Sequence, residues 1–180
     1  MFGIKLDFFK WVVKDMSFEA ERLIIRPIRG SIEPEQCARM IVEEEPWVRF
    51  GTSYEDSLHR MQDTSKEIYV AESDMQVVGF VIVNMQGTFI GYIQTVCVAA
   101  EQRGRGIGTK LIEWAEGRIF RDSPNVFICV SSFNQNARRL YERLGYSVIG
   151  ELKDYIVKGH SELLLRKTQG AWLDFQKHKC

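Results

Sequence analysis

Hydrophobic and polar positions follow two periods along the chain, and together they predict a mixed α/β fold. The runs 67–73, 76–86 and 89–99 are rich in β-branched and aromatic residues and are separated by short polar turns, as in an antiparallel meander. Apolar residues spaced three or four positions apart predict helices over 106–121 and 134–144. Strands and helices therefore alternate in one unit.

The other segments extend this order of elements in both directions. Further strands are expected over "RLIIRPI" (22–28), "NVFICVSS" (125–132), "YSVIGELKDYIV" (146–157) and "HSELLLRK" (160–167), the last two joined around Gly159. Helices are expected over 31–45, with Ser31 as N-cap, and over 54–66. A chain of 180 residues, 45% of them hydrophobic, can bury one sizeable core. We therefore expect a single domain over 1–180, with an N-terminal extension to about residue 20 and a tail over about 169–180.

Charge and cysteine content exclude several classes of protein. Lys plus Arg and Asp plus Glu both number 24, which removes the broad basic field of a nucleic-acid-binding protein. The four cysteines form no CxxC pair, so neither a metal site nor a disulfide framework is expected, and reduced thiols indicate a cytoplasmic protein. No apolar run approaches the roughly 20 residues needed to span a bilayer.

The N-terminal segment "MFGIKLDFFKWVVKDMSF" (1–18) is apolar but is broken by Asp7 and Lys10. It also lacks the small-residue cleavage site of a signal peptide. A short amphipathic helix is the preferred interpretation, packed on the domain or on a second subunit in a homodimer. Attachment to a membrane surface is the alternative.

The stretch "VCVAAEQRGRGIGTKLI" (96–112) passes from a strand through a glycine-rich turn into a helix. Glycines allow close backbone approach, and a helix N-terminus carries partial positive charge, so such a turn favours a phosphate or pyrophosphate. It is not a nucleoside-triphosphate P-loop, because Thr109 precedes Lys110 where GK[ST] is required. Nor does the spacing of Gly104, Gly106 and Gly108 match the dinucleotide fingerprint.

This stretch resembles the acetyl-CoA loop of the GNAT N-acetyltransferase superfamily. The family's valine-ended strand and Q/R-x-x-G-x-G/A turn are matched by 96–112, and its second half is matched by "FNQNARRLYERLGY" (133–146). The resemblance covers about 21–168 and implies a mostly antiparallel sheet with one splayed parallel strand pair and helices on both faces. It also implies direct acetyl transfer from acetyl-CoA, without a metal, to a primary amine of a small molecule or to a protein N-terminus or lysine.

The resemblance implies a set of residues around the acetyl-CoA. The strand end would pair with the pantetheine arm, the turn would hold the pyrophosphate, and one face of the following helix would contact the cofactor. Asn134 has the alternative role of a helix N-cap. These cofactor-binding residues are Val96, Cys97, Val98, Arg103, Gly104, Arg105, Gly106, Ile107, Gly108, Thr109, Asn134, Ala137, Arg138 and Tyr141.

The resemblance also implies how protons move. Tyr141 would protonate the departing thiolate, or else it packs in the core. Many relatives carry a basic carboxylate where this chain has Tyr92 and Cys129, and we interpret Cys129 as a structural thiol. The base is then expected on the hairpin, where His160 and Glu162 lie on the same side of a strand, although both also suit an exposed hairpin.

The acceptor is the least determined part of the resemblance. Trp47, Phe50, Tyr92 and Tyr155 are expected to line its site, and Glu43–Glu45 could attract a cation or simply be solvated. Two other functions stay open. One is a module that senses acetyl-CoA without turning it over, and the other is a scaffold that assembles through the N-terminal segment.

Overall fold

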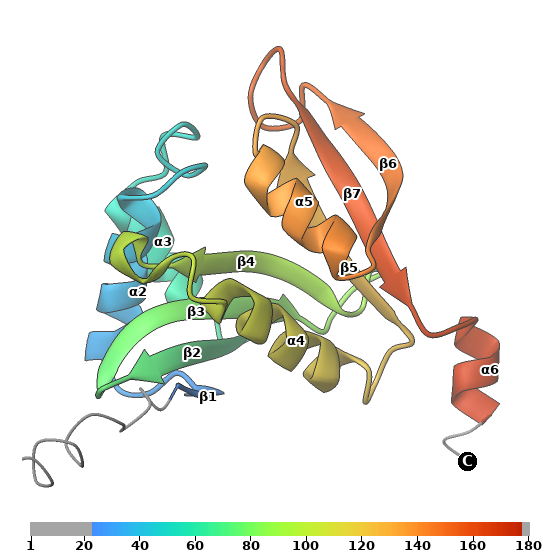
Figure 1. The fold of residues 1–180 in the computed structure, drawn as a ribbon, viewed down its shortest axis with the longest axis horizontal. Helices are drawn as coiled ribbons and strands as arrows, with labels where there is room; N and C mark the ends of the chain where they lie inside the picture. The colour runs from blue at the N-terminus through green and yellow to red at the C-terminus, as the bar shows by residue number, and fades with distance from the viewer. Residues whose placement is uncertain (1–22, 178–180) are drawn as a thin grey trace, which may run out of the picture.

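The computed structural model describes residues 23–177, which contain one seven-stranded sheet with strand order β1-β2-β3-β4-β5-β7-β6 (Figure 1). The strands are β1 (Ile24–Pro27), β2 (Glu67–Ser73), β3 (Gln76–Asn84), β4 (Tyr92–Val98), β5 (Asn125–Ser131), β6 (Ser147–Lys153) and β7 (Ser161–Thr168). The helices are α2 (Ile32–Val42), α3 (Tyr54–Met61), α4 (Ile107–Ile119), α5 (Gln135–Arg143) and α6 (Trp172–Lys177), with a 3₁₀ turn over Ala100–Gln102.

The sheet is antiparallel except where β4 and β5 meet. These two strands pair in parallel at only two positions, Tyr92 with Phe127 and Ile93 with Ile128. The register of β4 against β3 shifts just there, because Ile93 and Thr95 pair with consecutive β3 residues and Gln94 is left as an extra residue. A bulge of this kind bends a strand. Beyond it β4 and β5 separate, which confirms the predicted splayed parallel pair (Figure 1).

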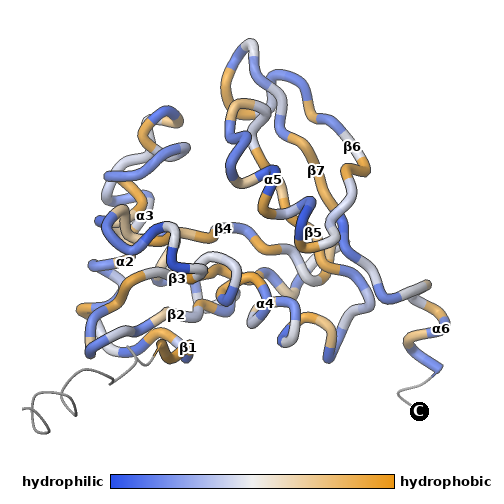
Figure 2. Tube along the Cα trace, viewed as in Figure 1, coloured by the Kyte–Doolittle hydropathy of each residue, from blue (hydrophilic) through white to orange (hydrophobic). Residues whose placement is uncertain are grey.

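Helices cover both faces of the sheet because β3 is apolar on both sides. Phe80 and Ile82 point into a cluster with α2 and α3, whereas Val81 and Val83 point into the cluster beneath α4. In Figure 2 the hydrophobic colour follows β3, β4 and β5 through the middle of the molecule. The mixed α/β fold class is therefore confirmed.

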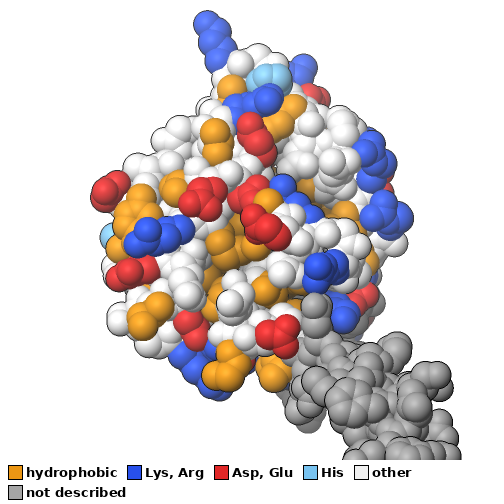
Figure 3. All heavy atoms as spheres, turned by 60° about the vertical axis from the view of Figure 1, so that its left-hand side comes forward, with side chains coloured by type: hydrophobic (Ala, Val, Ile, Leu, Met, Phe, Trp, Pro, Cys, Tyr) orange, Lys and Arg blue, Asp and Glu red, His pale blue; other side chains and the backbone are white. Residues whose placement is uncertain are grey.

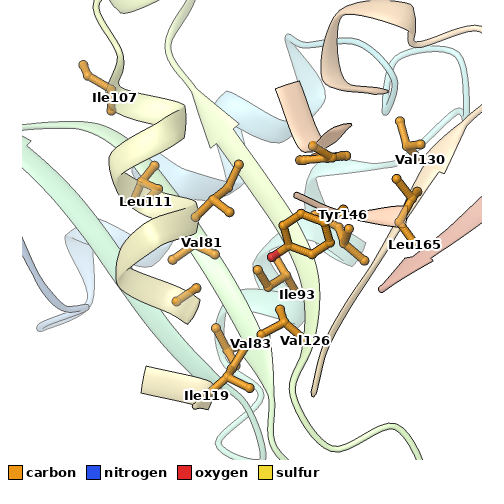
Figure 4. Packing of buried hydrophobic residues seen from close by; sticks show 14 of the residues in the cluster. Val81, Val83, Ile93, Ile107, Leu111, Ile119, Val126, Val130, Tyr146 and Leu165 are labelled. Carbon is orange, nitrogen blue, oxygen red and sulfur yellow. The ribbon is translucent and has the colours of Figure 1, made fainter. Parts of the chain in front are cut away.

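The cluster beneath α4 is the larger of the two and fixes the helix that follows the glycine turn. Leu111 and Ile119 of α4 are fully buried, and Tyr146 packs near Ile93 and Val126 on the other side of the cluster (Figure 4). Since α4 is held along its length by this packing, its N-terminus has a fixed position at the end of β4.

The structure corrects one local expectation, the end of the strand over 146–157, and adds detail to two others. Ser31 occupies the N-cap position of α2 but its side chain accepts no capping hydrogen bond, and the Glu33 carboxylate instead accepts from the backbone N–H of Arg29 at 2.7 Å. The strand expected over 146–157 ends at Lys153, because Asp154 takes a positive φ of 52° and its carboxylate accepts the N–H of Gly159 at 2.6 Å. Part of the tail over about 169–180 forms α6.

Residues 23–177 contain neither a group of metal ligands nor a helix able to span a membrane. In that range no His, Cys, Asp and Glu side chains group as metal ligands, and no helix is long and apolar enough to cross a membrane. Acidic and basic side chains are interspersed on the face drawn in Figure 3. The N-terminal segment 1–18, with its predicted amphipathic helix, lies outside the described residues.

Candidate active site

The diverging ends of β4 and β5 open onto two cavities. The turn cavity, of about 850 Å³, is lined by the end of β4, by the glycine turn and by α5. The hairpin cavity, of about 870 Å³, is lined by β4, β5, the loop after α2 and the β6–β7 hairpin. Both cavities share the residues Glu45, Pro46, Trp47, Val96, Asn134, Ala137 and Tyr141 as lining. They are therefore neighbouring parts of one opening between the strands.

The glycine turn forms the positively polarised end of the turn cavity. Gly104 and Gly106 have φ values of 75° and 80°, which other residues adopt only with strain, and Gly106 is the N-cap of α4. The intrahelical bonds begin with the N–H of Lys110 on the carbonyl of Gly106, so the N–H groups of the preceding first turn have no partner within the helix. A Cβ on Gly104 or Gly106 would meet no atom within 4 Å. The turn thus offers donors, helix-dipole charge and open space, which fit a pyrophosphate.

The arginines near this turn have different surroundings. Arg103 lines the turn cavity, donates to the carbonyl of Val98 at 3.2 Å and forms an ion pair with Glu44. Arg105 is exposed and does not line either cavity. On α5, Arg138 also lies outside both cavities, because its guanidinium bonds to Glu142 at 2.8 Å. Arg138, which is expected to contact the cofactor, therefore does not line the turn cavity.

Two other arginines of α5, Arg139 and Arg143, line the turn cavity instead. Sequence spacing alone gave no reason to choose them over Arg138. Which arginine reaches the cavity depends on the rotation of α5 about its axis, and that rotation is set by the burial of Tyr141 against the sheet.

The end of β4 presents backbone to the turn cavity, whereas the side chain of Cys97 points away. Cys97 is 3% exposed, belongs to the cluster with α2, and its Sγ lies 3.9 Å from the carbonyl oxygen of Met40. Burial raises the pKa of the Cys97 thiol to about 12, so the thiol stays protonated. Because β5 has separated from this part of β4, backbone groups there can pair with an extended ligand.

Asn134 and Tyr141 stand where the two cavities meet. Asn134 is the N-cap of α5, since its Oδ1 accepts the N–H of Ala137 at 3.2 Å. Tyr141 is 8% exposed, and burial raises the pKa of its phenol to about 12. The phenol therefore keeps its proton at any pH near neutrality.

Glu162 is the buried carboxylate of the hairpin cavity. It is 5% exposed, lies opposite Ser131 in the β5–β7 register, and its Oε1 accepts a 2.5 Å hydrogen bond from the Ser131 hydroxyl. Burial raises the pKa of this carboxyl above its ordinary value, and the serine bond opposes the shift. A carboxylate of raised pKa that lines a cavity is suited to accept a proton.

The other residues expected at the acceptor site also line the hairpin cavity. They are Trp47, Phe50, Tyr92 and Tyr155. Tyr92 and Cys129 lie side by side there, and burial is the main cause that raises the pKa of both. The thiol of Cys129 is therefore protonated, in agreement with a non-nucleophilic role.

His160 is not brought into either cavity. It precedes β7, and its ring packs edge-on against Phe133 with 5.1 Å between the ring centroids. Phe133 also contacts Phe50 and stacks beneath the Arg49 guanidinium. His160 thus belongs to an aromatic contact between the β6–β7 hairpin and the loop after α2, whereas Glu162, two residues on, lines the cavity.

The polar residues of the hairpin cavity that were not anticipated from the sequence include two cations and an amide. Arg60 comes from the last turn of α3, Lys66 directly precedes β2, and Asn84 ends β3. None stands in a recognisable motif, so only the packing of α3 against the sheet could place them together.

Comparisons with known proteins agree with this geometry. The model of the family described as "Acetyltransferase (GNAT) family" matches residues 35–146. An uncharacterized N-acetyltransferase of Methanocaldococcus jannaschii is 37% identical over 103 residues, which are 56% of this chain and 65% of that protein, just under two thirds of its length. The S-(2-succino)cysteine N-acetyltransferase of Bacillus subtilis is 28% identical over 130 residues, covering 67% of this chain and 78% of the relative.

Among solved structures, an aminoglycoside 6'-N-acetyltransferase complexed with coenzyme A is similar in fold. It matches with a TM-score of 0.67 and 16% sequence identity, covering 81% of this chain and 96% of that one. At this identity the match bears on the fold alone.

Proposed function

The chain belongs to the GNAT acetyltransferase family, and from this premise we propose that it transfers an acetyl group from acetyl-CoA directly to a primary amine. The observation that carries the proposal is that the turn cavity and the hairpin cavity share lining residues. A donor lying along β4 in the turn cavity meets, at Tyr141 and Val96, an acceptor lying in the hairpin cavity. The two substrates then react without a covalent enzyme intermediate.

The turn cavity supplies the groups that hold the donor. In our proposal the N–H groups of the turn from Gly104 to Thr109 bind the pyrophosphate, and Arg139 and Arg143 neutralise the remaining phosphate charge. The backbone of Val96–Val98 pairs with the pantetheine arm in the manner of an added strand. Acetyl-CoA supplies the reactive thioester.

Glu162 is proposed as the base that accepts the proton of the amine. A free alkylamine has a pKa of about 10, so it enters mostly as the ammonium ion, and only the neutral form can attack a thioester. Burial in the hairpin cavity lowers the pKa of the ammonium and raises that of Glu162, so the two values approach each other. The hydrogen bond from Ser131 fixes the carboxylate for this transfer.

The backbone of β4 and the Tyr141 phenol are proposed to stabilise the negative charge that develops on the thioester oxygen and on the departing thiolate. The N–H of Val98, on the side of β4 that faces away from β3, donates to the thioester oxygen as it gains negative charge. The phenol of Tyr141 donates its proton to the departing thiolate. Its pKa of about 12 means that it never competes as an anion near neutrality, although the pKa difference from a thiol makes it a donor of modest strength.

The relatives differ in the amine that they acetylate. The Bacillus subtilis relative is named for S-(2-succino)cysteine, a small molecule, and the solved structure is named for aminoglycosides. For this chain we propose a small amine as the acceptor, because the contacts of Phe133 with Phe50 and with His160 join the loop after α2 to the β6–β7 hairpin beside the shared opening.

The test is thioester cleavage with a panel of small amines and peptides, read by the mass of the acetylated product. We expect coenzyme A release that depends on the amine. Tight binding of acetyl-CoA without amine-dependent release would contradict the proposal and favour the sensor module. The buried carboxylate in the hairpin cavity argues against that alternative, since a sensor has no need of a base there.

A further inference from the structure

One end of the hairpin cavity is lined by cationic and amide side chains. Lys66 directly precedes β2, whose first residue pairs with Val83 of β3. Asn84 follows Val83 and pairs with Tyr92 at the start of β4. Arg60 reaches the same cavity from the C-terminal turn of α3. The cationic end therefore lies beside the start of β4.

The two cations of this end differ in their pairing. Lys66 forms an ion pair with Asp63 at 3.2 Å, and only 18% of its side chain is exposed. Arg60 is also partly buried, but within residues 23–177 no carboxylate lies at ion-pair distance from its guanidinium. Removing an unpaired charge from water is costly, so a partly buried free arginine facing a cavity is suited to bind an anion. Its planar guanidinium matches the paired oxygens of a carboxylate or phosphate.

The acidic groups of the same cavity are few. Its lining carboxylates are Glu162, which is buried against Ser131, and Glu45, whose side chain is 58% exposed and lies 3.9 Å from Arg49. A polyamine or another acceptor with several ammonium groups would therefore find one buried carboxylate and two cations. That balance disfavours polycations.

Glu162 and the cationic end lie at different positions along the sheet. Glu162 pairs with Ser131, whereas Tyr92, beside Asn84, pairs with Phe127. Phe127 and Ser131 are four residues apart, which corresponds to about 13 Å of strand. Arg60 and Glu162 both line the cavity that extends over this part of the sheet. Trp47, Tyr92 and Tyr155 line the same cavity and can contact the carbon chain.

We propose that the acceptor is a small amine that also carries an anionic group, a carboxylate or a phosphate, which Arg60 binds while the amine lies at Glu162. This inference rests on the proposed acetyl transfer and adds the class of acceptor. Lys66, held by Asp63, contributes further positive potential, and Arg60 provides the direct contact.

Matched pairs of amines test the proposal. Initial rates with acetyl-CoA are measured for 4-aminobutanoate against its amide, 4-aminobutanamide, and for O-phosphoethanolamine against ethanolamine. We expect kcat/KM to be at least about 10-fold higher for the anionic member of one pair, since hydrogen bonds to charged groups have that strength. The first pair reports a carboxylate and the second a phosphate. Equal rates within both pairs, or a preference for the members that lack the anionic group, would overturn the inference but leave acetyl transfer intact.

Variants of Arg60 assign the effect to this side chain. Arg60→Ala should lower kcat/KM for the preferred anionic amine about 10-fold or more and should lower it much less for the partner that lacks the anion, and Arg60→Lys should restore part of the loss. Arg121→Ala is the matched control, because Arg121 is exposed and lines neither cavity. If Arg60→Ala keeps the wild-type preference, the anion site is elsewhere and the proposal is wrong.

A binding measurement separates this inference from the proposed function. Calorimetric titration of O-phosphoethanolamine and of 4-aminobutanoate into protein saturated with coenzyme A requires no turnover. Binding that is lost in Arg60→Ala supports the anion site even if no amine is acetylated, in which case only the transfer activity fails. If neither compound binds in an Arg60-dependent way, or if only peptide amines are acetylated, the small anionic acceptor is refuted.

Discussion

Replacing Glu162 with glutamine separates the proposed chemistry from the structure around it. The substitution Glu162→Gln keeps the size of the side chain and an oxygen that accepts the hydrogen bond from Ser131, which measures 2.5 Å in the native protein. It removes only the negative charge and the ability to take a proton. A loss of activity in this variant is therefore a loss of the base rather than of packing.

The expected size of the effect follows from the role of a general base. Such groups contribute about 10²–10⁴-fold to the rate, so kcat should fall by that factor, which corresponds to about 2.7–5.4 kcal/mol of activation free energy. The residual rate should rise with pH as free amine accumulates. Affinity for acetyl-CoA should not change, because Glu162 does not line the turn cavity.

The Glu162→Gln variant should lose activity but gain stability relative to the wild type. Burial raises the folded-state pKa of Glu162 above its ordinary value of 4.5, so over the interval between the two values the native protein binds more protons than the unfolded chain. Wild-type stability therefore falls as the pH rises from about 4.5 through the raised folded-state pKa, and this loss persists at higher pH. Glutamine does not titrate and escapes the loss. The Tm of Glu162→Gln should exceed that of the wild type increasingly through this window.

The assay pairs steady-state rates between pH 6 and 10 with thermal melts over a wider range. The control is Glu151→Gln, since Glu151 also accepts a serine hydroxyl bond, from Ser161 at 2.7 Å, but is exposed on β6. It should leave kcat unchanged. Wild-type kcat in Glu162→Gln at every pH would show that the proton goes elsewhere, and the reasoning about this residue would fail.

Three further predictions concern the donor side. Tyr141→Phe should lower kcat about 10²–10⁴-fold with little change in acetyl-CoA affinity, and an unchanged kcat where chemistry limits the rate would mean that the tyrosine only packs. Gly106→Glu should abolish calorimetric binding of acetyl-CoA, whereas Gly30→Glu, at a similar positive φ of 61° but outside both cavities, should bind normally. Gly79→Ala would set a Cβ 2.8 Å from the carbonyl oxygen of Cys97, so it should cost about 1–3 kcal/mol in denaturant unfolding and weaken donor binding by displacing β4.

Much of the fold was predictable because its signals are local. The apolar run 76–84 is buried on both faces, and the glycines before α4 require the positive φ values that they adopt. The splayed strand pair, by contrast, was predicted only through the family resemblance. Its immediate cause, the extra residue Gln94 in β4, has no signature in the sequence.

The candidate site was predictable where the motif was contiguous and less so where contacts are long-range. Glu162 was expected on the hairpin, but its partner Ser131 is 31 residues away and is found only through the β5–β7 register. His160 was expected beside it, yet the hairpin loop over 154–160 turns that side chain toward Phe133. Arg60 carries no local signal of binding, because its surroundings come from three separate elements.

The two-residue pairing of β4 with β5 has a consequence for the lifetime of the protein. The strands β5, β7 and β6 join the rest of the sheet through a short parallel contact with β4. A donor in the turn cavity, which is lined by β4 and by α5, would add a second connection between these two parts. A ligand that binds only the folded protein stabilises it by about 2.7 kcal/mol at one hundred times its Kd. Amide hydrogen exchange along β4 and β5 should therefore slow in acetyl-CoA, and proteolytic clearance through the opened form should slow with it. The abundance of such a protein would follow the supply of its own donor.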